Sequence, residues 1–107
     1  MLTDEKLKQE QADEEMINQA FEHLLQSYLT SKHRRKVEII TKAFNFAKQA
    51  HKGVKRRSGE PYIMHPIAVA QIACSEIGLG STSICAALLH DVVEDTDYTV
   101  EDIRNIF

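Results

Sequence analysis

Apolar residues early in the chain recur at the spacing of an amphipathic helix. They fall at positions i, i+4, i+7, i+8, i+11 and i+12, namely Ile17, Phe21, Leu24, Leu25, Tyr28 and Leu29. This pattern predicts a first helix over about residues 4–29. Its first dozen residues are polar on every side, so we expect them to fray or to project from the fold.

A second apolar stripe predicts a helix over about residues 33–51. It consists of Val37, Ile40, Phe44, Ala47 and His51. Ser31 is suited to cap the start of this helix, because its hydroxyl can accept a hydrogen bond from a free backbone N–H. Gly53 is suited to end it, because glycine readily adopts the left-handed conformation that follows many helices.

A loop and two more helices are predicted in the middle of the chain. Residues 53–65 contain glycine, Ser-Gly and proline, a composition typical of a loop. The third helix is expected to begin at Pro66, which suits the first helical position, and to end at Gly78. The fourth covers about residues 84–94, where the run ICAALLHDVV is apolar on nearly every side. Such a helix is expected to be the central and most buried one.

Thr99 and Asp102 resemble a capping box that opens a fifth helix, which the end of the chain cuts short. Because the last apolar residues lack a visible partner further on, we expect the chain to be a fragment of a longer protein. No repeat or linker interrupts residues 1–107, so we interpret them as one partial domain. Residues 1–30 form its N-terminal helix, and residues 33–107 form the start of the main fold. These elements predict an all-α fold of about five helices.

The composition is that of an ordinary soluble domain of 107 residues, with 43% hydrophobic and 27% charged residues. No apolar run approaches the roughly 18 residues that a membrane span needs, and no signal-peptide pattern follows the acidic N-terminus. The two cysteines, Cys74 and Cys85, lie in apolar surroundings without the spacing of a metal finger or a disulfide framework. We therefore expect reduced core cysteines in a cytoplasmic protein, and we exclude zinc-finger and disulfide-scaffold folds.

The net charge of −3 hides a basic block in the middle of the chain. Residues 32–57 contain ten lysines and arginines and a single acid, Glu38, whereas the segments on either side are acidic. Such a block can attract a phosphate-rich ligand or RNA, although solvated helix faces explain its helical cations equally well. Lys55, Arg56 and Arg57 lie outside any helical pattern, so the simpler explanation is weaker for them.

Four ionisable residues follow the apolar fourth helix in the sequence HDVVED. Burying them without partners would be costly. On a helix, His90 and Glu94 share one face, and Asp91 and Asp95 share the adjacent one. Imidazole and carboxylate are good ligands for manganese, iron or zinc, and the two later acids can orient a water molecule or move protons. On spacing alone, an equally good interpretation is a helix end that emerges into solvent.

Two histidines elsewhere bear on this choice. His65 follows the predicted loop and precedes the proline at the start of the third helix, so it can reach the fourth helix as a third metal ligand. A loop histidine is more often a capping or surface residue, and that alternative stays open. His51 closes the apolar stripe of the second helix, and we interpret it as a packed, hydrogen-bonded core histidine.

Two long motifs resemble a known enzyme family. The segments AHKGVKRRSGEPYIMHP (residues 50–66) and LLHDVVEDTDYTVEDI (residues 88–103) are similar to the N-terminal HD hydrolase domain of the bifunctional RelA/SpoT enzymes. These enzymes make and degrade ppGpp and pppGpp, the alarmones of the stringent response. The resemblance runs from about residue 37 to the end, and it implies an HD-domain helical bundle of which this chain carries the N-terminal portion.

The resemblance also implies a metal site and a reaction. In the matching positions, His65, His90 and Asp91 are the ligands of a manganese ion. Glu94 and Asp95 match the catalytic acidic pair, which positions and activates the water that attacks the 3′-pyrophosphate. The products expected from ppGpp or pppGpp are GDP or GTP and pyrophosphate. The full-length protein is expected to be a GTP pyrophosphokinase as well.

The nucleotide site that the resemblance implies lies in the basic loop. Arg56 and Arg57 match a pair of basic residues, of which the first packs on the guanine base and the second lies near a phosphate. Ser58 follows them and is expected to contact the nucleotide. The implied ligand is therefore ppGpp or pppGpp, and neither nucleic acid nor a membrane is expected as a partner of this segment.

The chain departs from the family pattern in its length. The family's fourth ligand is an aspartate on a later helix, beyond residue 107, so the fragment is expected to bind metal weakly and to be inactive alone. The intact HD and ED residues argue against the synthetase-only branch of the family. Two alternatives stay open. One is another HD-type phosphohydrolase, which would not need the loop VKRRSGEPY, and the other is a non-catalytic helical module that forms a homodimer through exposed apolar surface.

Overall fold

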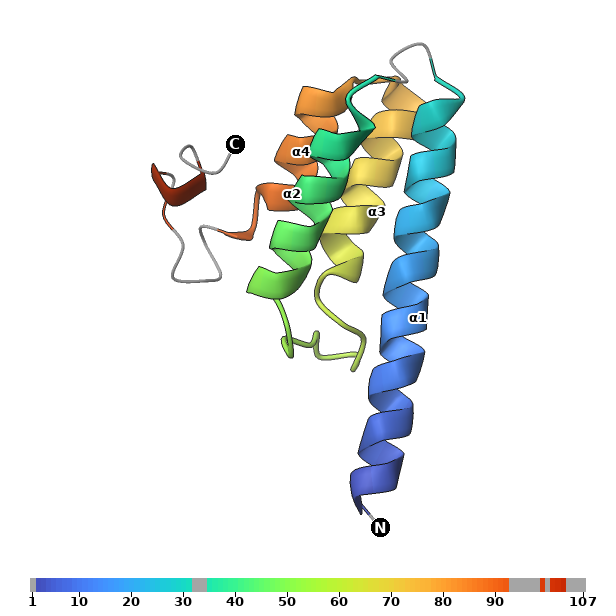
Figure 1. Ribbon diagram of the computed structural model, residues 1–107, viewed down its shortest axis with the longest axis vertical. Helices are drawn as coiled ribbons and strands as arrows, with labels where there is room; N and C mark the ends of the chain where they lie inside the picture. Colours follow the sequence, from blue (N-terminus) through green and yellow to red (C-terminus); the bar gives the residue numbers. More distant parts are fainter. Residues whose placement is uncertain (1, 32–34, 93–98, 100, 104–107) are drawn as a thin grey trace.

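The computed structural model describes residues 2–31, 35–92, 99 and 101–103, and every regular element that it describes is a helix. The elements are α1 (Leu2–Leu29), α2 (Val37–Ala50), α3 (Met64–Ile72), the π-helical segment η1 (Ala73–Ile77) and α4 (Ser81–Leu89). Helix α4 packs on α2 and α3, and α3 packs on α1, which lies along the edge of the bundle (Figure 1). The predicted all-α fold is confirmed, and the β-type pairing in these ranges is an isolated antiparallel bridge between Lys55 and Pro61.

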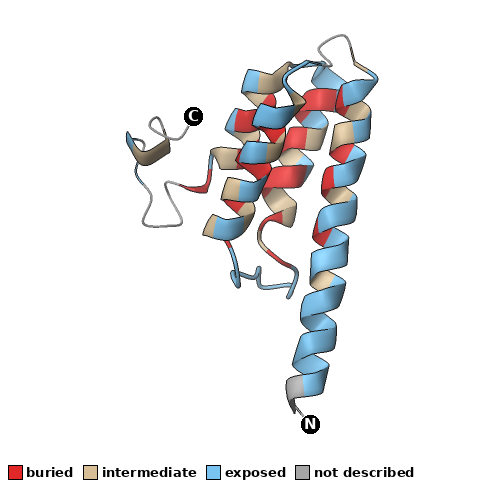
Figure 2. Cartoon of the chain, in the orientation of Figure 1, coloured by how far each residue is buried: buried red, intermediate tan, exposed pale blue. Residues whose placement is uncertain are grey.

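Helix α1 is buried only along its second half. Its apolar stripe of Ile17, Phe21, Leu24 and Tyr28 faces the core, whereas the described side chains from Asp4 to Met16 are exposed except for half-buried Asp13 (Figure 2). The aromatic rings of Phe21 and Phe44 stack with centroids 3.8 Å apart, which joins α1 to α2. The predicted projection of the N-terminal residues is therefore confirmed. No helix in the described part of the chain is long and apolar enough to cross a membrane.

Helix α2 begins later than predicted, and its predicted N-cap is wrong. Lys36 precedes the helix in the left-handed conformation, with a φ angle of 63°, and Val37 is the first helical residue. The Ser31 hydroxyl instead donates a hydrogen bond to the Tyr28 carbonyl oxygen at 2.6 Å, at the end of α1. Serine hydroxyls often bond back to a carbonyl three or four residues earlier, and this local contact prevailed here. Residues 33 and 34 lie outside the described ranges.

Helix α3 begins two residues before the predicted start, at Met64. Pro66 therefore lies within the first turn rather than at its first position, and it is tolerated there because these backbone N–H groups have no intrahelical acceptor. The helix continues into η1 and ends at Gly78, whose φ angle of 75° is in the left-handed region. The predicted end of this helix is confirmed.

Helix α4 carries buried Ile84, Cys85 and Leu88, and buried Val92 follows it. This helix was predicted to be the central and most buried one, and its buried residues face the core, but Ala86 is exposed and Leu89 is only half-buried. Apolar character all round a short helix permits burial, and in the described structure α4 packs mainly on α2 and α3, with a smaller contact to η1. The remainder of the predicted helix, residues 93 and 94, lies outside the described ranges.

The predicted capping box near the end of the described residues is confirmed. The Thr99 backbone N–H donates to Asp102 Oδ2 at 2.9 Å, and the Asp102 N–H donates to Thr99 Oγ1 at 3.1 Å. These reciprocal bonds satisfy two of the N–H groups that a helix start leaves free. They begin a short helical stretch over residues 101–103.

Both cysteines are buried core residues, as predicted, with 4% of Cys74 and 8% of Cys85 exposed. Burial raises the pKa of each thiol, because the apolar surroundings disfavour the charged thiolate. The thiolate is the reactive form of cysteine, so these two side chains serve packing rather than chemistry.

A substitution in the core tests how much the buried face of α1 contributes to stability. Replacing fully buried Leu24 with alanine should lower the free energy of unfolding by about 2–5 kcal/mol, because it leaves a cavity beside the neighbouring helices. The matched control is Leu7→Ala on the same helix, where half of the residue is exposed and a change within about 0.5 kcal/mol is expected. Urea unfolding followed by circular dichroism measures both variants, and equal effects would contradict this description of the core.

Candidate metal centre

Three side chains predicted to bind metal lie together at one end of the bundle. His65 lies in the first turn of α3, and His90 and Asp91 directly follow α4. The oxygen Oδ2 of Asp91 lies 3.1 Å from His90 Nε2 and 3.8 Å from His65 Nε2. One nitrogen or oxygen from each of the three residues lies within 4.8 Å of the others. The structure therefore brings this predicted group together.

The packing of α3 against α4 explains why residues far apart in sequence meet here. The start of α3 lies beside the end of α4, so a histidine in the first turn of one helix reaches the residues that follow the other. The Asp91 side chain is only 12% exposed, whereas those of His65 and His90 are 38% and 41% exposed. The group is thus anchored in the protein through its carboxylate and open to solvent at its imidazoles.

The hydrogen bonding of His90 prepares its Nε2 atom to bind a cation. Its Nδ1 atom lies 2.5 Å from the Ala87 carbonyl oxygen. Because a carbonyl oxygen can only accept, this contact requires a proton on Nδ1, and Nε2 is the nitrogen that faces Asp91. Nε2 lies 3.1 Å from Asp91 Oδ2, so these two atoms are placed to bind one cation together.

The spacing and chemistry of the three donors fit a bound divalent cation. Nitrogen and oxygen ligands about 2.1 Å from a metal lie about 3–3.5 Å apart when they occupy adjacent positions. The distances of 3.1 and 3.8 Å from the Asp91 oxygen are close to that range. Two imidazoles and one carboxylate suit manganese, iron or zinc, and they do not by themselves select one of these ions.

Tyr62 supports this group, a contact that the sequence did not predict. Its hydroxyl donates a hydrogen bond to Asp91 Oδ2 at 3.0 Å. Its ring lies 6.0 Å from the His65 ring and 5.0 Å from the ring of buried His51, measured between centroids. The prediction that His51 is packed in the core is confirmed by its 3% exposure. The available signal was the aromatic residue three positions before His65, but its partner lies 29 residues away.

The residues predicted to bind nucleotide lie in a hairpin-like loop, residues 54–62. The Tyr62 N–H donates to the Val54 carbonyl at 2.9 Å, and the Arg56 N–H donates to the Glu60 carbonyl at 2.9 Å. The turn closes with a bond from the Gly59 N–H to the Arg56 carbonyl at 2.8 Å, and the Gly59 φ angle of 92° favours glycine there. This hairpin is therefore an ordered platform for the side chains at its tip.

A shallow pocket of about 630 Å³ lies against the hairpin. Arg56, Arg57 and Ser58 line it together with Tyr62, whose hydroxyl reaches Asp91. Arg56 and Arg57 are exposed, and Arg56 pairs with Glu60 at 3.4 Å, a solvent-exposed contact that an anionic ligand can readily replace. The predicted catalytic pair, Glu94 and Asp95, lies outside the described residues.

Comparison with known proteins identifies the class to which this fold and site belong. The model of the HD domain family matches residues 43–107, so the chain belongs to that family. This matched range includes the hairpin and all three residues of the metal-binding group.

Similar proteins within this class are RelA/SpoT synthases and hydrolases of (p)ppGpp, which confirms the resemblance noted in the two motifs. The chain is 47% identical over 79 residues to guanosine-3′,5′-bis(diphosphate) 3′-pyrophosphohydrolase of Aquifex aeolicus, covering 74% of this chain and 11% of that enzyme. It is 51% identical over 71 residues to a probable GTP pyrophosphokinase of Mycobacterium leprae, covering 66% and 9%. It is 42% identical over 89 residues to the bifunctional (p)ppGpp synthase/hydrolase SpoT of Escherichia coli, covering 83% and 12%. The chain thus spans about a tenth of the length of these relatives.

The hydrogen bond from Tyr62 to Asp91 leads to a testable expectation. Replacing Tyr62 with phenylalanine removes the donor that orients Asp91 Oδ2, and affinity for a divalent cation, with manganese as the probe, should fall about 10–100-fold. Electron paramagnetic resonance of free manganese during a titration measures this change. The matched control is Tyr28→Phe, which removes a buried hydroxyl bonded to the Arg35 carbonyl. Equal metal affinities of the two variants would contradict the role given to Tyr62.

Proposed function

We propose that this chain supplies metal-binding and nucleotide-binding residues to a site that hydrolyses the 3′-pyrophosphate of ppGpp and pppGpp. The observation that carries this proposal is the convergence of His65, His90 and Asp91 beside a pocket lined by Arg56 and Arg57. The names of the relatives from Aquifex aeolicus and Escherichia coli support the same reaction. We assign the chain to a bifunctional protein that also carries GTP pyrophosphokinase activity, as the relative from Mycobacterium leprae suggests.

Each group of residues has a distinct task in this proposal. His65, His90 and Asp91 hold a divalent cation, which we propose to be manganese. When bound, such a cation supplies positive charge to the phosphate oxygens on which negative charge develops. Arg56 packs on the guanine base, and Arg57 pairs with a phosphate through its planar guanidinium. Ser58 lines the same pocket and supplies a hydroxyl that can hydrogen-bond the nucleotide.

The products define which bond the site must cleave. Formation of GDP and pyrophosphate from ppGpp requires the bond between the ribose 3′-oxygen and the adjoining phosphorus to break. A water oxygen forms the new bond to that phosphorus, and the 3′-oxygen leaves and takes up a proton. We propose that Glu94 and Asp95 orient this water and accept its proton as it attacks.

A combined binding and turnover experiment tests this function. Manganese binding to this chain is measured by titration calorimetry, and conversion of ppGpp to GDP and pyrophosphate by the proposed bifunctional protein is measured by ion-exchange chromatography. We expect weak manganese binding by the chain alone, because its three donors leave positions that water must fill, and manganese-dependent ppGpp hydrolysis by the bifunctional protein. Tight, stoichiometric binding to the chain alone would contradict this expectation and would mean that a further ligand comes from elsewhere, such as a second copy of the chain.

The choice of substrates separates this function from that of another HD-type phosphohydrolase. GTP, GDP and a deoxynucleoside triphosphate serve as comparison substrates in the same assay. Preference for ppGpp agrees with the proposal, whereas equal hydrolysis of nucleotides without a 3′-pyrophosphate contradicts it.

Dimerisation of the chain stays a prediction, and sedimentation velocity checks it. The exposed apolar side chains of Ile72, Ile77 and Leu79 are the surface concerned.

A further inference from the structure

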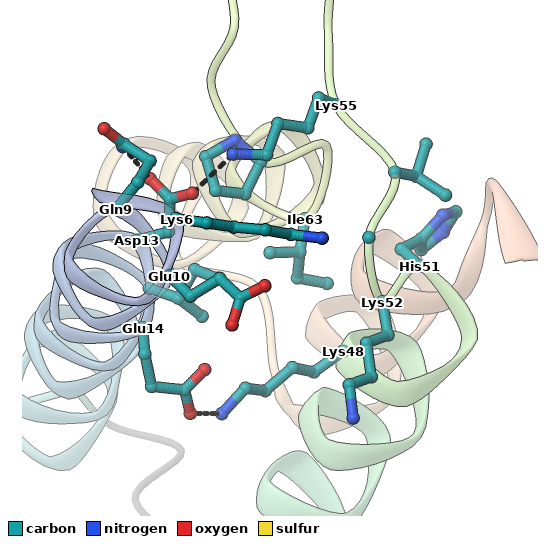
Figure 3. Close-up of a pocket in the computed structure, with 14 residues that line it drawn as sticks. Lys6, Gln9, Glu10, Asp13, Glu14, Lys48, His51, Lys52, Lys55 and Ile63 are labelled. Carbon is teal, nitrogen blue, oxygen red and sulfur yellow. Dashed lines mark hydrogen bonds and ion pairs between the residues drawn. The ribbon is translucent and has the colours of Figure 1, made fainter. Parts of the chain in front are cut away.

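Helix α1 makes a direct contact with the hairpin that carries the two arginines. Asp13, near the middle of α1, accepts a hydrogen bond through Oδ2 from Lys55 Nζ at 2.6 Å. Its other oxygen, Oδ1, accepts from Gln9 Nε2 at 2.9 Å, so both carboxylate oxygens are engaged. Figure 3 shows Lys55 reaching down from the hairpin toward Asp13. The contact links residues 42 positions apart in the sequence.

This contact crosses a cleft rather than a packed apolar interface. A cleft of about 500 Å³ lies between α1, the end of α2 and the hairpin, and Ile17 and Ile63 contribute to its apolar lining. A second ion pair, between Glu14 and Lys48, joins α1 to α2 across the same cleft (Figure 3). A cleft separates α1 from the hairpin where Asp13 and Lys55 meet, and their ion pair connects α1 to the hairpin across it.

The backbone of the hairpin couples the position of Lys55 to the positions of Arg56 and Arg57. Lys55 is paired with Pro61 in the antiparallel bridge, and Arg56 and Arg57 follow it directly. Bonds from Tyr62 to Val54 and from Arg56 to Glu60 flank this bridge and restrict the backbone on both sides. Displacement of Lys55 therefore displaces the residues at the tip of the hairpin.

The charge of Asp13 is secured by its partners. The hydrogen bond from Lys55, followed by that from Gln9, keeps the pKa of the Asp13 carboxyl below its usual value. The carboxylate is therefore ionised throughout the neutral pH range. Only 13% of the Asp13 side chain is exposed, compared with 52% for Glu14 in the neighbouring ion pair, so water competes less with the contact to Lys55.

We propose that Asp13 is a positioning residue for nucleotide binding, because it holds Lys55 and thereby presents Arg56 and Arg57 to the nucleotide. This inference rests on the proposed function for the identity of the ligand. It extends the site to α1, which lies outside residues 43–107, the range matched by the HD domain family. The expected effect is moderate, because a single partly exposed ion pair contributes up to about 1 kcal/mol, or about a fivefold change in affinity.

The test compares two alanine variants of neighbouring acids in α1. Asp13→Ala removes the contact with the hairpin, whereas the matched control Glu14→Ala removes an equal charge and an ion pair with α2. Amide hydrogen exchange of residues 54–62 is measured without nucleotide, and the dissociation constant for ppGpp is measured by calorimetry at constant salt. We expect faster exchange in the hairpin and about fivefold weaker ppGpp binding for Asp13→Ala alone. Urea unfolding of both variants shows that the global fold is retained.

Exchanging the charges of Asp13 and Lys55 tests whether the ion pair itself is responsible, because a general structural defect would not be rescued by this exchange. Combining Asp13→Lys with Lys55→Asp restores an ion pair of reversed direction, and hairpin exchange and ppGpp affinity should return toward their original values. Unchanged exchange in Asp13→Ala, equal effects of Glu14→Ala, or faster exchange without loss of ppGpp affinity would each overturn the inference. If the unaltered chain bound no ppGpp, the proposed function would fail, while the exchange data would still decide whether Asp13 holds the hairpin.

Discussion

Replacing Asp91 with alanine should abolish manganese binding and hydrolysis of ppGpp. Asp91 Oδ2 is the atom that lies near both His90 Nε2 and His65 Nε2, and it also accepts the Tyr62 hydrogen bond. Loss of this oxygen removes the only negative charge of the described group, so the loss of affinity should exceed the roughly 10–100-fold that follows from losing a supporting residue. In the proposed bifunctional protein, synthesis of ppGpp should persist, because the proposal places synthesis at a separate site.

Two further variants show whether charge or packing is responsible. Asp91→Asn keeps the shape and an acceptor for Tyr62 but lacks the negative charge, so it should also bind manganese poorly while it folds normally. Glu76→Gln removes an exposed acid from η1, at the far end of the segment that begins with α3, and should leave affinity unchanged. Metal content, ppGpp breakdown and ppGpp synthesis are measured on one preparation. Breakdown at the original rate in Asp91→Ala would remove Asp91 from the site.

Glu94→Gln should have a different effect, which separates catalysis from metal binding. In the proposed mechanism Glu94 accepts a proton from the attacking water, and general-base assistance of this kind contributes about 10²–10⁴-fold to a rate. The amide of glutamine is similar in size but cannot accept that proton. We therefore expect manganese and ppGpp to remain bound while hydrolysis falls by about two orders of magnitude or more.

The control for Glu94 is the same substitution at an exposed acid nearby in the sequence, Glu101→Gln, which should leave turnover unchanged. Metal content and hydrolysis rate, measured together, distinguish three results. Retained metal with lost turnover agrees with a base, lost metal would make Glu94 a ligand, and full activity would make it a solvated acid at a helix end. The last two results contradict the proposal.

The periodic spacing of apolar residues predicted the helices that bury one apolar face, and it predicted which residues lie on that face. The buried residues of α1 are members of the stripe identified from spacing, and all described regular elements are helical. The start of α2 was not predicted, because Ser31 bonded back to α1 and left Lys36 to precede the helix in a left-handed conformation. The Ser31 hydroxyl can bond either to a carbonyl at the end of α1 or to an N–H at the start of α2. The spacing of apolar residues does not indicate which of the two it chooses.

In the candidate site, too, some residues could be predicted from the sequence and others could not. His90 and Asp91 attracted attention because charge follows an apolar helix, and His65 through its place in a long motif. Tyr62 and Asp13 were not found, since their partners lie 29 and 42 residues away and depend on how the helices pack. A tyrosine before a helix and an aspartate on a polar helix face have many ordinary explanations in a sequence. Only the folded arrangement gives them specific partners.

In the proposed site, the position of Tyr62 links metal binding thermodynamically to nucleotide binding. Its ring lines the pocket of Arg56 and Arg57, while its hydroxyl bonds to Asp91. A nucleotide that shifts this ring also shifts the orientation of the carboxylate, so occupancy of one site changes the free energy of binding at the other. Linkage makes such an effect reciprocal: if the cation tightens nucleotide binding by some factor, the nucleotide tightens cation binding by the same factor. In the proposed site, Tyr62 therefore couples the affinities for cation and nucleotide by the same factor in both directions.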